Sequence, residues 1–221
     1  AANQSLDCIN LWAEKNSMNN NEAIKFHAEK LGINSNSSIH QNKKPNLKIF
    51  SSSDDKKELP PEPYPLNAFT HHKYGSPSYV YTYYAPTGEL IGYTCRFDLS
   101  DGSKVVLPFT WSNVIGKNSD GSPKQSSKPS WHWNAHGWNG WPIYGAEKLL
   151  KNNSSTVLIC EGEKTALAAQ SILKNCVVIS WAGGTSKANK VDWNLLQDRN
   201  VVIWPDADSK ADRSGNLLPW Y

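Results

Sequence analysis

Residues 156–181 read TVLICEGEKTALAAQSILKNCVVISW, and the spacing of apolar residues here indicates the fold class. A short apolar run at 156–160 is followed over 163–174 by apolar residues at helical spacing. A second apolar run occupies 177–181, and a third, VVIW, occupies 201–204. Apolar strands that alternate with helices are typical of a parallel sheet covered on both faces. We therefore expect an α/β fold with a parallel-sheet core here.

The preceding part of the chain is rich in β-forming residues. Two runs, at 79–84 and 90–97, flank a Pro-Thr-Gly turn, and a third run at 104–109 follows an Asp-Gly turn. This pattern predicts an antiparallel meander of three strands. Residues 116–130, rich in Gly, Ser, Lys and Pro, are predicted to form a loop. The aromatic cluster that follows is expected to fill a core, with stacking on nucleic-acid bases as the alternative: Trp131, Trp133, Trp138 and Trp141.

Shifts in composition predict four segments. Residues 1–32 are expected to form an N-terminal helical segment, with apolar residues at helical spacing. Residues 33–61 are rich in Asn, Ser, Lys and Pro and are expected to form a linker. Residues 62–150 would form the antiparallel β-rich subdomain, and residues 151–221 the α/β domain. We expect the chain to be a fragment, because it stops soon after its most suggestive motif.

Composition places few limits on the protein's partners. The 221 residues carry a formal net charge of +3, which permits nucleic-acid binding without requiring it. Most of the positive charge is lysine, which suits contacts to phosphate better than the reading of bases. No stretch approaches the length of a membrane span, so we expect no membrane partner.

The four cysteines are widely spaced, at positions 8, 95, 160 and 176. This spacing is poor for a zinc site and sparse for a disulfide framework. Cys160 and Cys176 lie in or beside apolar runs, and we expect them to be small buried core residues. A reducing cytoplasm is the compartment that such cysteine usage favours.

Acidic residues follow two of the three predicted strands. Glu161 follows the first strand, and Asp206 and Asp208 follow the third. The carboxyl ends of parallel strands meet at one edge of the sheet, where ligands bind in open α/β folds. Clustered carboxylates need a cation between them, and such hard oxygen ligands favour Mg²⁺ or Mn²⁺. Each element alone could be a solvated turn, so the predicted metal site depends on their combination.

A glycine pair follows the second strand. Gly183 and Gly184 would let backbone N–H groups approach a phosphate closely. Lys164 and Lys187, on either side of this turn in the sequence, could neutralise phosphate charge. These four residues are the predicted phosphate or nucleotide contacts.

Three sequence segments resemble the Toprim domain shared by primases, topoisomerases and some nucleases. They are VLICEGEKTA at 157–166, ISWAGGT at 179–185 and VVIWPDAD at 201–208. The resemblance implies a Toprim-like fold in which Glu161 is the characteristic glutamate and Asp206 and Asp208 bind Mg²⁺ or Mn²⁺. These three acids would be the catalytic residues.

The nearest resemblance is to primases and primase–helicases of phages and mobile elements. It implies a DNA primase that makes short primers on a single-stranded DNA template from nucleoside triphosphates, with a replicative helicase in cis or in trans. Residues 6–32 resemble the helical tail of a primase zinc-binding domain, so zinc is expected only upstream of residue 1. We expect the fragment alone to make little primer, because later Toprim elements are missing.

Two other functions remain open. A Toprim-type nuclease would use the same acids to cleave a strand. A non-catalytic template-binding module of a primase–helicase would have lost the chemistry.

The β-rich segment also offers a candidate surface for single-stranded DNA. Tyr79, Tyr81 and Tyr83 fall on one face of a predicted strand and could stack on bases. Positive residues nearby could bind the phosphates: Arg96, Lys104, Lys117, Lys124 and Lys128. In the alternative interpretation, the tyrosines face the core and the lysines only keep the protein soluble.

Overall fold

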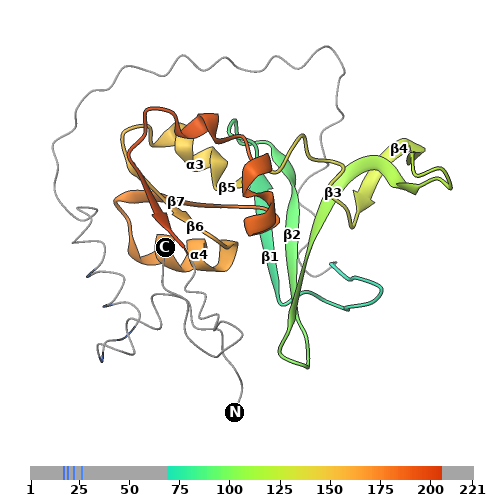
Figure 1. Cartoon of the computed structure of the whole chain (residues 1–221), viewed down its shortest axis with the longest axis horizontal. Helices are drawn as coiled ribbons and strands as arrows, with labels where there is room; N and C mark the ends of the chain where they lie inside the picture. Colours follow the sequence, from blue (N-terminus) through green and yellow to red (C-terminus); the bar gives the residue numbers. More distant parts are fainter. Residues whose placement is uncertain (1–16, 18, 20–21, 23–25, 27–68, 206–221) are drawn as a thin grey trace, which may run out of the picture.

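The computed structural model describes residues 17, 19, 22, 26 and 69–205. Apart from four isolated positions, the predicted helical segment at 1–32 and the linker at 33–61 lie outside the described residues. Within 69–205 the chain forms two four-stranded sheets (Figure 1). The expected α/β class is confirmed, with an antiparallel sheet followed by a mixed sheet.

The first sheet is a meander in the order β1-β2-β3-β4. Its strands are β1 (Tyr79–Tyr84), β2 (Leu90–Asp98), β3 (Lys104–Lys117) and β4 (Pro123–His132), and all neighbours are antiparallel. The loop predicted over 116–130 was wrong, because most of it is β4. Its sequence, PKQSSKPSWH, is polar and mostly exposed, as suits an edge strand that needs no buried face. Periodicity therefore gave no signal for it.

One face of this sheet carries a core of aromatic side chains. Phe69, Tyr93, Phe97 and Phe109 are at most 5% exposed. Trp131 stacks on Phe109, with ring centroids 5.4 Å apart and an interplanar angle of 11°. The expectation that the tryptophans fill a core is confirmed here.

The second sheet has the order β5-β7-β6-β8. β6 (Thr156–Cys160) lies between β7 (Cys176–Trp181) and β8 (Val201–Trp204) and is parallel to both. β5 (Ile143–Tyr144) pairs antiparallel with β7, so the sheet is mixed. The sheet therefore takes residues from before the boundary expected between residues 150 and 151.

Helices cover both faces of this sheet (Figure 1). α4 (Glu163–Ile172) packs through Ala166 and Ala169 against Leu158 and Val178. α3 (Ala146–Lys151) packs through Leu149 on the opposite face, in a second cluster. Two 3-10 helices, η2 (Thr185–Lys190) and η3 (Trp193–Leu196), lie between β7 and β8. Such double cover explains why β6 and β7 are continuous apolar runs.

The two sheets meet along a seam. Its buried residues are Tyr81 and Tyr83 from β1, Trp138, and Ala182 just after β7. Tyr144 of β5 packs against this cluster. The seam brings the tyrosine face of β1 against the α/β domain.

Cysteine burial follows the sequence prediction. Cys160 and Cys176 are buried, as is Cys95. Over the described residues, none of the helices has the length and apolar character needed to cross a membrane.

Candidate functional site

Two of the three predicted strand ends are joined by a hydrogen bond. Glu161 directly follows β6, and Thr185 follows the Gly183–Gly184 turn after β7. The hydroxyl Oγ1 of Thr185 donates to Oε1 of Glu161. Because β6 and β7 are parallel neighbours, their carboxyl ends bring the glutamate and the turn together.

The turn after β7 needs glycine for two reasons. Gly183 has φ +84° and Gly184 has φ +66°, a region that side chains with a Cβ avoid. A Cβ on Gly183 would lie 2.5 Å from both Cζ3 of Trp141 and Cγ of Lys187. Lys187 in turn places Nζ 5.1 Å from the Trp141 ring centroid. The turn is thus packed closely against the Trp141 ring, over which the Lys187 ammonium lies.

The third strand end leads to the remaining predicted acids. Cys160 pairs with Trp204 in the β6–β8 ladder, so Glu161 and the end of β8 share one edge of the sheet. Asp206 and Asp208 lie outside the described residues. Within the described residues, no group of three His, Cys, Asp or Glu side chains could hold a metal ion. Glu161 and Thr185 supply oxygen donors, which fit Mg²⁺ or Mn²⁺.

The second glutamate of the EGEKTA stretch has a different partner. Oε1 of Glu163 accepts a hydrogen bond of 2.7 Å from the hydroxyl of Tyr83. Burial raises the pKa of Glu163, against the opposing effect of this hydrogen bond. Burial also raises the pKa of Tyr83 well above its ordinary value. Glu163 thus connects β1 of the first sheet to α4, whereas Glu161 connects the carboxyl ends of β6 and β7.

The tyrosine row of β1, formed by Tyr79, Tyr81 and Tyr83, is mostly buried and so differs from the exposed binding surface that the sequence predicted. Tyr81 is 3% exposed and Tyr83 is fully buried, because the α/β domain packs over them. Their rings contact Tyr144, at centroid distances of 6.0 and 5.4 Å. The base-stacking role predicted for Tyr81 and Tyr83 is therefore corrected, since neither ring has a face open to a base. Tyr79, at the end of the row, is 41% exposed.

The open end of the row meets two predicted cationic contacts. Arg96 lies directly opposite Tyr79 in the β1–β2 ladder, with Cζ 6.0 Å from its ring centroid. Lys164, in the first turn of α4, places Nζ 5.2 Å from the same centroid. The structure thus brings together residues predicted separately for nucleic acid and for phosphate.

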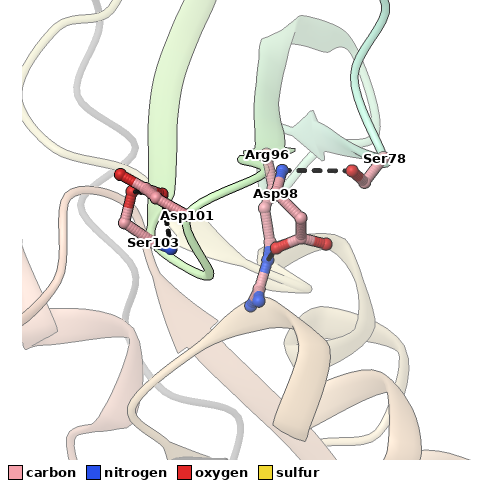
Figure 2. Close-up of polar contacts among 5 residues, drawn as sticks. All are labelled: Ser78, Arg96, Asp98, Asp101 and Ser103. Carbon is pink, nitrogen blue, oxygen red and sulfur yellow. Dashed lines mark hydrogen bonds and ion pairs between the residues drawn. The ribbon is translucent and has the colours of Figure 1, made fainter. Parts of the chain in front are cut away.

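An acidic residue orients the arginine. Nε of Arg96 donates to Oδ1 of Asp98 at 2.7 Å, and the backbone N–H of Asp98 donates to the Ser78 hydroxyl (Figure 2). The hydrogen bond from Arg96 is the main reason that the pKa of Asp98 is lowered, and the charge of Lys164 contributes. Asp101, also shown in Figure 2, bonds within its own turn to Ser103.

The other predicted lysines lie elsewhere. Lys117 ends β3, and Lys124 and Lys128 lie on β4, all three exposed. Figure 1 shows β4 on the side of the molecule away from α4. These lysines therefore do not share a site with Glu161 or Lys164.

Sequence reasoning did not assign roles to Thr185, Glu163 or Asp98. Thr185 could have been suspected, because it directly follows the glycine pair. Asp98 lies two residues after Arg96 on the same face of β2, so strand alternation could have suggested this pair. The partner of Glu163 is Tyr83, 80 residues earlier in the chain, and the sequence has no signal for that contact.

Comparison with protein families finds a match for part of the chain. A family model described as "Domain of unknown function (DUF6371)" matches residues 117–207, which is less than half of the chain. This range begins at the end of β3 and contains Glu161, Lys164, Lys187 and the glycine pair. No curated protein and no solved structure matches the chain.

Proposed function

We propose that this chain is part of a DNA primase with a Toprim-like catalytic domain. It would join nucleotides into short primers on single-stranded DNA by metal-dependent nucleotidyl transfer. The observation that carries the proposal is the hydrogen bond from Thr185 to Glu161 at the carboxyl ends of β6 and β7. It supports a ligand site at the sheet edge, as expected from the resemblance of EGEKTA and VVIWPDAD to Toprim primases.

The proposed reaction is a phosphoryl transfer. The 3′-hydroxyl of the growing primer attacks the α-phosphate of a nucleoside triphosphate and loses its proton. A new P–O bond forms, and the bond to the leaving pyrophosphate breaks. The protein's part in such a reaction is mainly to position the reactants and to stabilise charge.

The chain offers distinct groups for these tasks. Glu161, with Asp206 and Asp208, would hold Mg²⁺ or Mn²⁺, which when bound stabilises negative charge on the phosphate oxygens. Lys187, next to the Gly183–Gly184 turn, would neutralise the triphosphate. A replicative helicase, in cis or in trans, would bring the template strand.

Primer synthesis on a single-stranded template tests the proposal. Labelled products would be measured with residues 1–221 and with the complete encoded protein, in Mg²⁺ and in Mn²⁺. We expect primers that appear only when both the template and the divalent metal are present. In the complete protein, Glu161→Gln should lower the rate at least about 100-fold, because one charged ligand is lost. The matched control is Glu89→Gln at an exposed turn.

The competing functions predict different products. Strand cleavage without primers, lost in Glu161→Gln, would replace the proposal with a nuclease. Neither product from the complete protein, together with template binding, would indicate the non-catalytic module. Primer synthesis that survives Glu161→Gln would exclude this site as the catalytic centre.

A further inference from the structure

We infer that single-stranded nucleic acid binds at the seam between the sheets, with one base stacked on Tyr79 and the adjacent phosphates on Lys164 and Arg96. This inference rests on the proposed function and deepens it, because it assigns a place to the template strand. It replaces the predicted surface, which combined Tyr81 and Tyr83 with lysines of β3 and β4.

The exposure of the tyrosine row selects Tyr79. Along one face of β1 the exposed fraction falls from 41% at Tyr79 to 3% at Tyr81 and 0% at Tyr83. The Tyr81 ring lies nearly parallel to that of Tyr79, at 8° and with centroids 6.2 Å apart. The buried Tyr81 ring therefore packs against Tyr79. Of the three tyrosines, only Tyr79 has exposed ring surface on which a base could stack. Stacking on an aromatic face needs no particular base.

Two cations lie over this ring. They come from different parts of the fold: Arg96 from β2, 6.0 Å from the centroid, and Lys164 from the helix α4, 5.2 Å from it. When a base stacks on the ring, two such cations can turn to the phosphates on either side of that base. A duplex keeps its bases stacked on one another, so this arrangement favours single strands.

Asp98, the acidic neighbour of Arg96, limits the positions in which a phosphate can bind. Asp98 accepts from Nε of Arg96, and this is the only hydrogen bond of the guanidinium within the described residues. The terminal nitrogens therefore remain available as donors. Because the Asp98 carboxylate repels phosphate and lies within electrostatic reach of Lys164 as well as Arg96, a phosphate is expected to approach the two cations from the side away from Asp98. Lys104, which pairs with Asp98 in the β2–β3 ladder, is exposed and adds a further positive charge.

The position of Lys164 connects this surface to the candidate site. It lies three residues after Glu161, in the first turn of α4. A strand that contacts Lys164 therefore passes beside the sheet edge that carries Glu161. By contrast, none of Lys117, Lys124 and Lys128 has its ammonium over an aromatic ring in the described part of the chain.

Fluorescence anisotropy with labelled oligothymidylate tests the inference directly. Tyr79→Ala should raise the Kd about 5- to 150-fold, the equivalent of about 1–3 kcal/mol for one stacked base. Tyr79→Phe keeps the ring and should bind like the wild type. Lys164→Gln should make the slope of log K against log salt less negative by about 0.7, the value for one phosphate on a single strand. Replacing Lys117, Lys124 and Lys128 together by Gln should change the Kd less than Tyr79→Ala does.

Each outcome separates the inference from the proposed function. If the triple lysine variant abolishes binding and Tyr79→Ala does not, the seam is not the binding surface, although a primase remains possible. If the wild type binds no oligothymidylate at low salt, the inference is overturned, whereas primer synthesis is measured independently. Loss of binding in Tyr79→Ala, with no primers from the complete protein, would uphold the inference and sink the proposed function. Circular dichroism confirms that each variant is folded.

Discussion

The hydroxyl of Tyr83 donates a hydrogen bond of 2.7 Å to Oε1 of Glu163, and this contact joins the antiparallel sheet to the start of α4. Tyr83 is fully buried, so the bond is shielded from water. Glu163 lies between Glu161 and Lys164 in the turn that enters α4. The contact therefore holds the two sheets together next to Lys164, the proposed nucleic-acid contact, and Glu161 at the sheet edge.

Removing the tyrosine hydroxyl should destabilise the protein. We expect Tyr83→Phe to lower the free energy of unfolding by about 1–3 kcal/mol, because Glu163 loses its donor in a buried setting. Glu163→Gln keeps an acceptor and removes a buried charge, so it should cost less. Urea unfolding measures both. The control is Tyr84→Phe, since the Tyr84 hydroxyl makes no hydrogen bond within the described residues. Equal effects of Tyr83→Phe and Tyr84→Phe would contradict the prediction.

The Gly183 turn should not tolerate a side chain. Gly183→Ala combines a positive φ with a clash against Trp141, and the two costs can be separated. Gly121 has the same φ of +84°, but a Cβ there would meet nothing within 4 Å. We expect Gly121→Ala to cost about 1–2 kcal/mol from the backbone alone. Gly183→Ala should cost about 1–3 kcal/mol more, from overpacking.

The Gly183→Ala comparison also tests function. If the turn approaches a triphosphate, Gly183→Ala should weaken nucleotide binding, and Gly121→Ala should leave it unchanged. Calorimetric titration with a nucleoside triphosphate and Mn²⁺ measures this. Equal nucleotide affinity in both variants would remove the turn from the proposed site.

Metal binding should depend on the three predicted acids. We expect loose Mn²⁺ binding that tightens when nucleotide is present, because phosphate oxygens complete the coordination. Glu161→Gln and the double variant Asp206→Asn with Asp208→Asn should each weaken it. Glu89→Gln should not. Calorimetry with Mn²⁺ alone and with nucleotide decides this, and identical titrations for all the proteins would refute the site.

The three parallel strands of the α/β domain could be predicted almost residue by residue. The predicted runs at 156–160 and 201–204 have the bounds of β6 and β8. Continuous apolar runs carry a strong signal because both faces of that sheet are covered. β5, only two residues long, carries no period and was not predicted.

The candidate site could be predicted only in part, for a different physical reason. Alternation placed Tyr79, Tyr81 and Tyr83 on one face, which the structure confirms. It could not show what covers that face, because burial depends on a domain distant in the sequence. The contact of Lys164 with Tyr79 spans the same seam, so local pattern could not reveal it.

A buried histidine should make stability depend on pH. His71 is 8% exposed, and its Nδ1 accepts a hydrogen bond of 3.1 Å from the backbone N–H of Lys73. Burial lowers the pKa of His71 from its ordinary value of 6.5, and the neighbouring charges of His72 and Lys73 lower it further. The unfolded chain therefore takes up a proton more readily than the folded protein does.

The sign of the effect follows from this difference in proton uptake. Stability due to neutral His71 is intact above pH 6.5 and is lost as the pH falls below 6.5 towards the lowered pKa of the folded state. Protonation of Nδ1 would also break its bond to Lys73. Urea unfolding between about pH 7 and pH 5 should show this decline in wild type. His71→Asn keeps an acceptor but does not titrate. The free energy of unfolding of this variant should therefore be lower than that of the wild type and should change less with pH over this range. His136→Asn, at an exposed histidine, should keep the wild-type slope, and a slope unchanged in His71→Asn would show that another group is responsible.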